Sequence, residues 1–249
     1  MEIVTVSLEM SGVDVSRPYI EAAAPEHPSL IDETHQMDAL FGVVNIPNVI
    51  WIDEQGVIVR PPEPGWPGLS RLPEGLMKIA RRNAELAADA RQKSGDTVGE
   101  AKTERKGIAQ LLGGGQDRAS YPDAIRDWAA NGGESRFALT PDEVVARSQP
   151  RPMSMSEGAA HFELANHLWR SGNRDAAVPH FDASHRLQPA NWTYKRQAWS
   201  LVGNERVGGE FGRFTQAPLP GEESDWPFAS DFAKDTAKLE PGEYYPKTM

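Results

Sequence analysis

The stretch FGVVNIPNVIWIDEQGVIV, residues 41–59, decides the architecture of the N-terminal part of this chain. Residues 48–53 are rich in β-branched and aromatic side chains and predict a strand, and residues 57–60 predict a return strand. Gly56 lies in the short turn between them, because glycine tolerates the positive φ that such a turn needs. The prolines at 61, 62 and 64 are expected to end the pairing, so the stretch predicts a β-hairpin.

Strand and helix patterns alternate around this hairpin. Residues 2–8 form an apolar run typical of a buried strand, and residues 14–24 predict a short helix with Ser16 as its N-cap. Residues 37–41 predict a helical turn that ends at Gly42, and apolar residues at helical spacing predict a longer helix over 74–92. Residues 1–92 therefore read as an α/β unit.

Helical patterns dominate after residue 92. Residues 93–150 are interpreted as a linker with connecting helices at 105–112, 121–131 and 141–147. The last of these begins with Thr140 followed by Pro141 and Glu143, a capping box with proline at the first helical position.

Residues 151–217 predict an all-α domain built on a helical hairpin. Leu164, Ala165 and Leu168 share one face of its first helix, which Gly172 ends, and Ala177 and Phe181 share one face of the second, which ends at Pro189. Residues 218–249 are rich in Pro, Gly, Glu and aromatic residues, so a mostly irregular tail is expected there.

Composition excludes several classes of function. The formal net charge is −10, which argues against a nucleic-acid partner, since such proteins carry a basic footprint. No run approaches the roughly 18 apolar residues of a membrane span, and no signal peptide is visible at the N-terminus, so a cytoplasmic location without membrane contact is the default expectation. The chain has no cysteine, which removes disulfides, thiolate metal sites and any cysteine nucleophile.

Two local patterns resemble functional sites but do not meet the spacing that such sites require. His180 and His185 are five residues apart, whereas helical zinc pairs prefer a separation of four, so these histidines are interpreted as surface or capping residues. The glycines at 113–115 have neither a preceding strand nor a following Gly-Lys-Ser/Thr, so they predict a helix end and a turn. No metal site, cofactor or catalytic residue is predicted in this chain.

Residues 2–92 resemble the thioredoxin-like superfamily, in particular its redoxin and TlpA-like branch, which is related to the peroxiredoxins. Four pieces carry the resemblance: VTVS at 4–7, PSLID at 28–32, FGVVNIPN at 41–48 and VIWIDEQGVIV at 49–59. The resemblance implies that Pro47 is a cis-proline beside the active site, with Ile46, Asn48 and Trp51 as candidate residues of the active-site wall. An ordinary trans proline before a strand is the alternative for Pro47, and burial in a core is the alternative for Trp51.

The departure from that family concerns its catalytic half. In the family, a C-x-x-C motif stands on a β-α unit that precedes the strand matched here by residues 2–8. The resemblance therefore implies an incomplete sheet, with a gap between strand 2–8 and strand 48–53 that leaves two edges unpaired or forces them to pair directly. Two explanations stay open: a natural protein that extends upstream, which we favour, or a family member that has lost its redox half.

The helical hairpin resembles a tetratricopeptide repeat. Residues on the spacing of that motif are Leu164, Ala165, Leu168, Gly172, Ala177, Phe181, Ser184 and Pro189. Ser184 stands where the family prefers alanine, and His161 where it prefers tryptophan. One full repeat is visible, and stable arrays need at least about three, so this one is expected to pack against neighbouring helices.

The two resemblances together imply a two-part protein with a function in binding. We expect a redox-silent thioredoxin-like domain joined to a helical region that accepts a segment of a protein partner, in the role of a scaffold or binding module. The alternative is a thiol–disulfide oxidoreductase or peroxide reductase whose catalytic cysteines lie upstream of this start.

Overall fold

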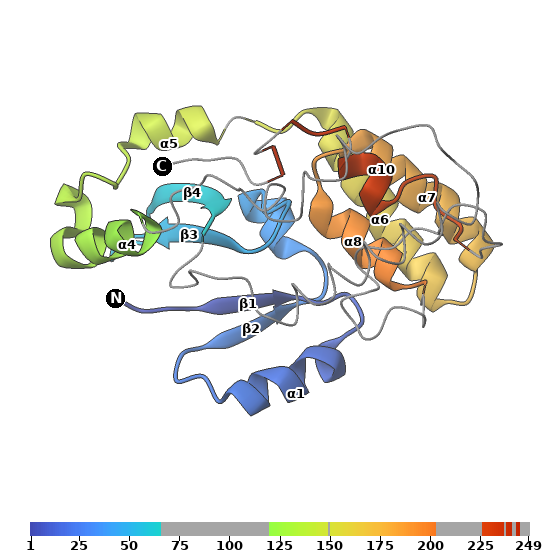
Figure 1. The fold of residues 1–249 in the computed structure, drawn as a ribbon, viewed down its shortest axis with the longest axis horizontal. Coiled ribbons are helices and arrows are strands. Elements are labelled where there is room, and N and C mark those ends of the chain that lie inside the picture. Colours follow the sequence, from blue (N-terminus) through green and yellow to red (C-terminus); the bar gives the residue numbers. More distant parts are fainter. Residues whose placement is uncertain (66–119, 149, 203–225, 237, 241–242, 245–249) are drawn as a thin grey trace, which may run out of the picture.

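The computed structural model describes residues 1–65, 120–148, 150–202, 226–236, 238–240 and 243–244 (Figure 1). Within these ranges the chain is mixed α/β, as the sequence predicts, with two small sheets before residue 65 and helices after residue 120. The predicted helices at 74–92 and 105–112, and the glycines at 113–115, lie outside the described residues.

The first sheet pairs β1 (Thr5–Leu8) with β2 (Ser29–Asp32) in parallel, and α1 (Val13–Ala23) connects them. The prediction of Ser16 as an N-cap is wrong, because the helix begins one turn earlier, after Gly12. Ser16 lies inside α1 and is buried, and its hydroxyl is 2.9 Å from that of Ser7 on β1. The serine therefore ties the helix to the sheet.

The second sheet is the hairpin of β3 (Asn48–Ile52) and β4 (Ile58–Pro64). Gly56 has a φ of 78° in the turn, as predicted. The expectation that the prolines end the pairing is wrong, since Asn48 still pairs with Pro64. Proline is tolerated on an edge strand where its missing N–H would face away from the partner, and β4 pairs only with β3 in the described chain.

The two sheets do not pair with one another in the described part of the chain. In Figure 1, β1 and β3 are the inner strands, with β2 beyond one and β4 beyond the other. Between the sheets in sequence, η1 (Met37–Phe41) forms the predicted helical turn and ends at Gly42, whose φ is 82°. The Ile46–Pro47 peptide bond is cis, the isomer that the resemblance implies.

The hairpin packs against α4 (Ser120–Asn131) and contacts α5 (Pro141–Arg147). Trp51 and Val59 form a small core with Tyr121 and Ala124 of α4. The short η2 (Gly132–Glu134) leads to α5. The predicted capping box of α5 is confirmed: Thr140 accepts a hydrogen bond from the Glu143 N–H, and the Glu143 carboxylate accepts one from the Thr140 N–H.

The helical region contains α6 (Met153–Arg170), α7 (Arg174–Leu187) and α8 (Trp192–Ser200). The first two form the predicted antiparallel hairpin, and Gly172 has a φ of 83° in its turn. Its core contains Phe162, Phe181 and Trp199, and it also takes in Met10 from the loop after β1. No helix in the described residues is long and apolar enough to cross a membrane.

The tail segment, residues 226–244, returns to this helical region (Figure 1). It contains the short helix α10 (Phe232–Thr236) and is otherwise irregular where it is described. Phe228 and Tyr244 are buried members of the main core, and Trp226, Phe232 and Leu239 pack against it. The sequence predicts an irregular tail but not its burial.

Candidate functional site

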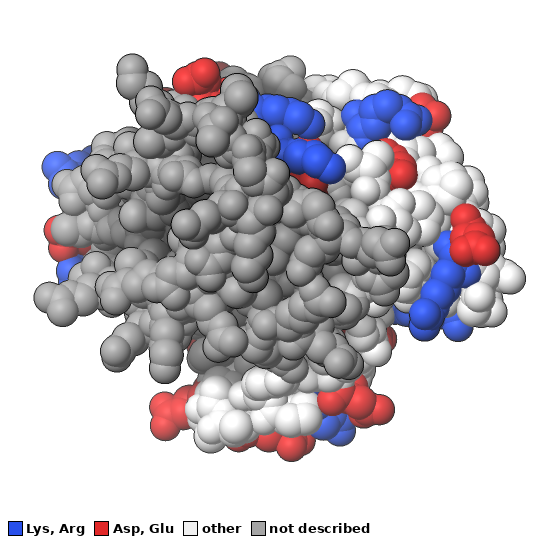
Figure 2. All heavy atoms as spheres, turned by 45° about the vertical axis from the view of Figure 1, so that its right-hand side comes forward, with Lys and Arg blue, Asp and Glu red and all other residues white. Residues whose placement is uncertain are grey.

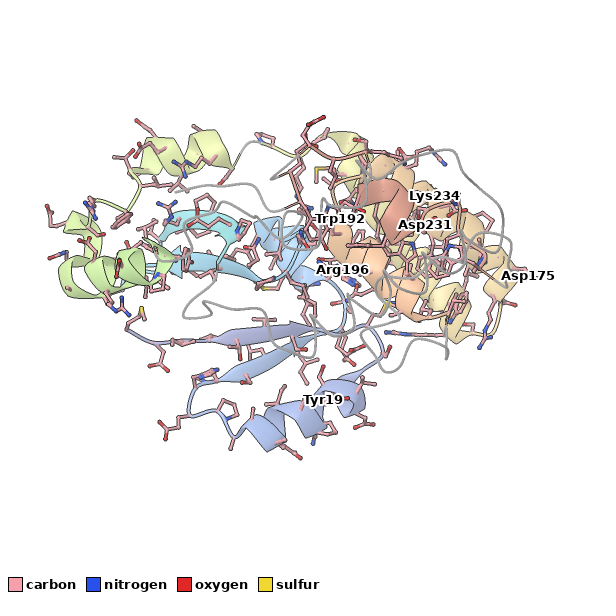
Figure 3. The ribbon with its side chains drawn as sticks, in the orientation of Figure 1. Tyr19, Asp175, Trp192, Arg196, Asp231 and Lys234 are labelled. Carbon is pink, nitrogen blue, oxygen red and sulfur yellow. The ribbon has the colours of Figure 1, made fainter. Side chains whose placement is uncertain are left out.

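The candidate site is the face of α7 and α8 on which the tail segment lies; we call it the tail-docking face. Phe181, Asp182 and His185 supply it from α7, and Trp192, Lys195 and Trp199 supply it from α8. Residues 181 and 185 are about one helical turn apart on α7, and residues 192 and 199 are about two turns apart on α8. Each pair therefore lies along one side of its helix. Figure 3 shows Trp192 on α8 and Asp231 and Lys234 close by on the tail, with Asp175 at the outer end of α7.

Aromatic side chains anchor the tail segment to this face. The Phe228 ring meets Phe181 edge-on at 5.8 Å between centroids, and Trp226 lies 6.4 Å from Trp199. Trp192 contacts Tyr244 at 4.7 Å and Phe232 at 6.1 Å. Aromatic pairs of this geometry contribute about 0.5–1.5 kcal/mol each beyond the area they bury. Aromatic packing therefore holds the tail at Trp226, Phe228, Phe232 and Tyr244.

Ser230 supplies a polar contact at the centre of the face. Trp199 Nε1 donates a hydrogen bond to Ser230 Oγ at 3.3 Å, and His185 Nδ1 lies 2.8 Å from the same oxygen. An indole nitrogen can only donate, so the serine accepts from Trp199 and its own hydroxyl hydrogen is free to go to His185. One serine hydroxyl thus satisfies two ring nitrogens of the face.

The environment of His185 keeps its imidazole neutral. Burial, together with the nearby charge of Lys195, lowers the pKa of His185 to about 3. A neutral ring has one nitrogen that accepts, and Nδ1 is available to accept from Ser230. Its Nε2 is buried without a hydrogen-bond partner. The polar interaction of this ring with the tail is therefore made through Nδ1, which contacts Ser230.

The tail-docking face also binds a backbone N–H and a side-chain carboxylate of the tail. Asp182 accepts a hydrogen bond from the Ala229 N–H at 3.0 Å, and burial raises the pKa of this carboxyl. Lys195 Nζ lies 2.8 Å from Asp235 Oδ2, and both side chains are buried. Burial lowers the pKa of Lys195. For Asp235, burial alone would raise the pKa, but the hydrogen bonds from Lys195 and Lys238 outweigh burial. The pKa of Asp235 is therefore lowered.

The N-terminal unit supports the helical region through buried polar contacts. His35 places its Nδ1 2.6 Å from Glu163 Oε1 on α6 and its Nε2 2.5 Å from Gln197 Oε1 on α8. Asp38 is buried and pairs with Arg151 at 2.5 Å. Buried polar groups that are fully paired fix a relative position, because losing a partner leaves a desolvated group behind.

Asn45 joins the N-terminal unit to both the tail and α8. Its Nδ2 donates to the Tyr244 carbonyl at 2.8 Å, and its Oδ1 accepts from the Arg196 guanidinium. Close by, the Thr193 N–H at the start of α8 donates to the Val44 carbonyl at 3.1 Å. The loop before Pro47 is therefore part of the support for α8.

The predicted active-site wall is not gathered into one surface. Ile46 is 42 % exposed and Pro47 is exposed, whereas Trp51 is buried and stacks on Trp128 of α4 at 4.8 Å. Trp51 Nε1 also donates to the Tyr121 hydroxyl at 3.2 Å, and burial raises the pKa of Tyr121 to about 12. Asn48 has a buried Oδ1 without a hydrogen-bond partner. Trp51 thus takes the alternative that the sequence left open, burial in a core.

Most of the predicted helical-repeat residues pack as the spacing suggests. Ala165, Ala177 and Phe181 are fully buried, and Leu168 packs against the same core. Leu164 is the exception, since it is 43 % exposed and points away from that core. Gly172 forms the turn of the hairpin and Pro189 follows the end of α7, where it is exposed.

The interpretation of His180 and His185 as surface or capping residues is wrong for His185, which is buried and faces the tail. His180 has a different histidine as its neighbour. The structure pairs it with His161 of α6, with the two Nδ1 atoms 2.8 Å apart, while His185 turns to the tail. Two nitrogens at that distance share one hydrogen, so one ring donates and the other accepts. The described residues contain no group of three or more side chains able to hold a metal ion.

Figure 2 shows the charged side chains on one face of the described surface. On the side shown in Figure 2, Lys and Arg lie in small groups among Asp and Glu and among uncharged residues of the described surface. The ion pair of Lys195 with Asp235 is a local contact between α8 and the tail.

Comparison with models of known protein families gives no match for this chain, and comparisons with curated proteins and with solved structures give none either.

Proposed function

We propose that this protein is a binding module whose tail-docking face accepts an extended segment of a protein partner. In this proposal the N-terminal unit is a redox-silent domain of the thioredoxin-like type, and the helical hairpin is of the tetratricopeptide type. The N-terminal unit acts as a scaffold that holds α6 and α8 in place.

The observation that carries the proposal is the way the face already holds a chain segment. Phe228 fills an aromatic site, the Ala229 N–H is bound by Asp182, and Asp235 is paired with Lys195. Aromatic anchors combined with backbone hydrogen bonds and a fixed charge pair are how protein surfaces recognise peptide segments. The α7–α8 face has all three.

The composition favours binding over thiol chemistry. A thioredoxin-type reaction begins with attack by a cysteine thiolate, and none of the 249 residues is cysteine. The His35 contacts to Glu163 and Gln197 support the same role, because they pre-organise the helices, and pre-organisation reduces the entropy lost when a partner binds.

Peptide selection tests the proposal. A random peptide library would be selected on the immobilised full chain and on its Ser230→Ala variant, in which the tail contact is weakened. Hydrogen exchange with each selected peptide would show where it binds. We expect peptides that protect α7 and α8.

Matched variants give the control. Asp182 binds the backbone of a docked segment, so Asp182→Asn should reduce binding several-fold, whereas Asp175→Asn at the exposed start of α7 should not change it. Selection of no peptide by either chain, or protection confined to other elements, would contradict the proposal.

A further inference from the structure

The strongest unassigned feature is that the tail-docking face is filled by the chain's own residues. The segment 226–236 contacts it through side chains, a backbone N–H and an ion pair. These contacts join residues 27 to 47 positions apart in sequence, so local helix formation does not account for them.

We propose that residues 226–236 are an intramolecular ligand, and that the partner carries the same chemistry: an aromatic anchor, a hydroxyl residue two positions later and a carboxylate five positions after that. This inference rests on the proposed function of the face as a peptide-binding surface, and it adds the class of partner and the competition that controls access.

The aromatic requirement comes from the site of Phe228. Phe228 is 5 % exposed, and its ring centroid is 5.8 Å from that of Phe181 and 6.1 Å from that of His185. Trp226 packs edge-on against the same ring at 5.5 Å. Replacing an aromatic anchor with a small residue leaves an empty apolar site, and anchors of this kind dominate binding energy.

The requirement for a hydroxyl comes from Trp199 and His185, whose ring nitrogens both contact the Ser230 hydroxyl oxygen. Trp199 Nε1 can only donate, and the neutral His185 ring presents Nδ1 to the same oxygen. A segment with alanine at this position would leave both nitrogens without this partner in a part-buried setting. Rejection of an analogue that lacks a hydroxyl is characteristic of sites built to hydrogen-bond one.

The carboxylate requirement comes from Lys195. Its ammonium is buried, donates to the Pro189 carbonyl at 2.7 Å and pairs with Asp235. A buried cation that loses its counter-ion is strongly disfavoured, so an occupant without an acid at this position is discriminated against.

Docking of the chain's own tail limits how often a partner can reach the tail-docking face. A partner binds only the fraction of molecules in which the tail has left, and its apparent dissociation constant rises by the inverse of that fraction. A tail that is docked in about 99 of 100 molecules would therefore weaken apparent binding about 100-fold.

A synthetic peptide of residues 226–240 tests this inference. Labelled with a fluorophore, it would be titrated into the full wild-type chain and into full chains carrying Ser230→Ala or Phe228→Ala. The peptide should bind both tail variants at least about tenfold more tightly than the wild type, because their own tails compete less well. Peptides carrying the Ser230→Ala or Phe228→Ala change should bind each chain at least tenfold less tightly than the parent peptide.

Several outcomes would overturn the inference. Circular dichroism and urea unfolding would establish that a variant is folded, and Ser230→Ala is included because it removes a single oxygen. A folded Ser230→Ala chain that does not bind the peptide, or that binds the Ser230→Ala peptide equally well, refutes the assignment. A wild-type dimer that forms with increasing concentration and buries the tail would show that a second copy supplies the segment.

The proposed function and this inference can fail separately. Library-selected peptides that protect α7 and α8 but lack the aromatic, hydroxyl and acid pattern would leave the binding module intact and refute the inference. Failure of both the library and the tail peptide would refute both.

Discussion

His35 and Glu163 are 128 residues apart in sequence, and Nδ1 of the histidine lies 2.6 Å from Oε1 of the glutamate. The other ring nitrogen, Nε2, faces Gln197 Oε1, while Gln197 Nε2 donates to the Leu8 carbonyl at 3.2 Å. Because that carbonyl can only accept, the amide orientation of Gln197 is set and His35 Nε2 carries a hydrogen. The ring of His35 therefore connects β1, α6 and α8.

Replacing His35 tests this connection. His35 is 2 % exposed and packs edge-on against Phe162 and Tyr194, so His35→Ala leaves a cavity and unpaired polar partners. We expect a loss of about 2–4 kcal/mol in the free energy of unfolding, measured with urea. His167→Ala on the exposed side of α6 is the control, with an expected change within about 0.5 kcal/mol. Equal effects of the two changes would contradict the role given to His35.

Acid pH should loosen the tail-docking face through His185. Its pKa is about 3 in the folded protein against an ordinary value of 6.5, so between these pH values the unfolded chain binds a proton that the folded chain excludes. The contribution to stability is complete above about pH 6.5 and is lost as the pH falls toward 3, with a slope approaching about 1.4 kcal/mol per pH unit.

The measurement is the free energy of unfolding at several pH values for the wild type and for His185→Asn. Asparagine places a polar group near the position of Nδ1 but does not titrate. The variant should show a shallower dependence over this range. Identical pH profiles would show that His185 is not the responsible group.

The ion pair of Arg60 and Glu63 should be sensitive to loss of one partner. Both side chains are buried, and the guanidinium binds the carboxylate through two nitrogens at 2.5 and 2.8 Å. Glu63→Gln removes the carboxylate charge from this buried pair, at a cost of about 3–5 kcal/mol. The double change Arg60→Met and Glu63→Leu should cost less than Glu63→Gln alone.

Urea unfolding of the single and double variants measures this difference. The exposed pair Asp123–Arg126, with the same three-residue spacing, is the control, and Asp123→Asn should change stability by less than about 1 kcal/mol. A Glu63→Gln variant as stable as Asp123→Asn would refute the assignment.

Gly158 on α6 should not tolerate alanine, although alanine is the better helix former. A Cβ there would lie 2.8 Å from Gln188 Cγ and 3.2 Å from Leu187 Cβ at the end of α7. Overpacking costs roughly 1–3 kcal/mol, and Gln188 would also be pushed away from the Met155 carbonyl that it binds at 2.6 Å.

We expect Gly158→Ala to lower the thermal midpoint, since this cost exceeds the gain of about 1 kcal/mol in helix propensity. Gly133→Ala is the matched control, because no atom lies within 4 Å of the added Cβ. A midpoint that rises in Gly158→Ala would show that α6 and α7 separate freely at this position.

Features that depend only on neighbouring residues could be predicted from the sequence. The turn at Gly56, the capping box of Thr140 and Glu143, and the α6–α7 hairpin follow from local φ preferences, hydrogen bonds over three residues and helical periodicity. Errors arose where context overrides such rules: Ser16 binds β1 in place of capping α1, and Pro64 pairs on an edge strand.

The candidate site depends on contacts that form only in the folded chain. Phe181 is recognisable as a packing residue from its spacing, but its partner Phe228 lies in a tail without periodicity, and the Ser230–His185 and His35–Glu163 contacts join residues 45 and 128 positions apart. Local patterns record which face of a helix is apolar; they do not record which distant segment covers it. That choice depends on the shape and the unpaired polar groups of the folded surface, and these exist only after α7 and α8 have packed.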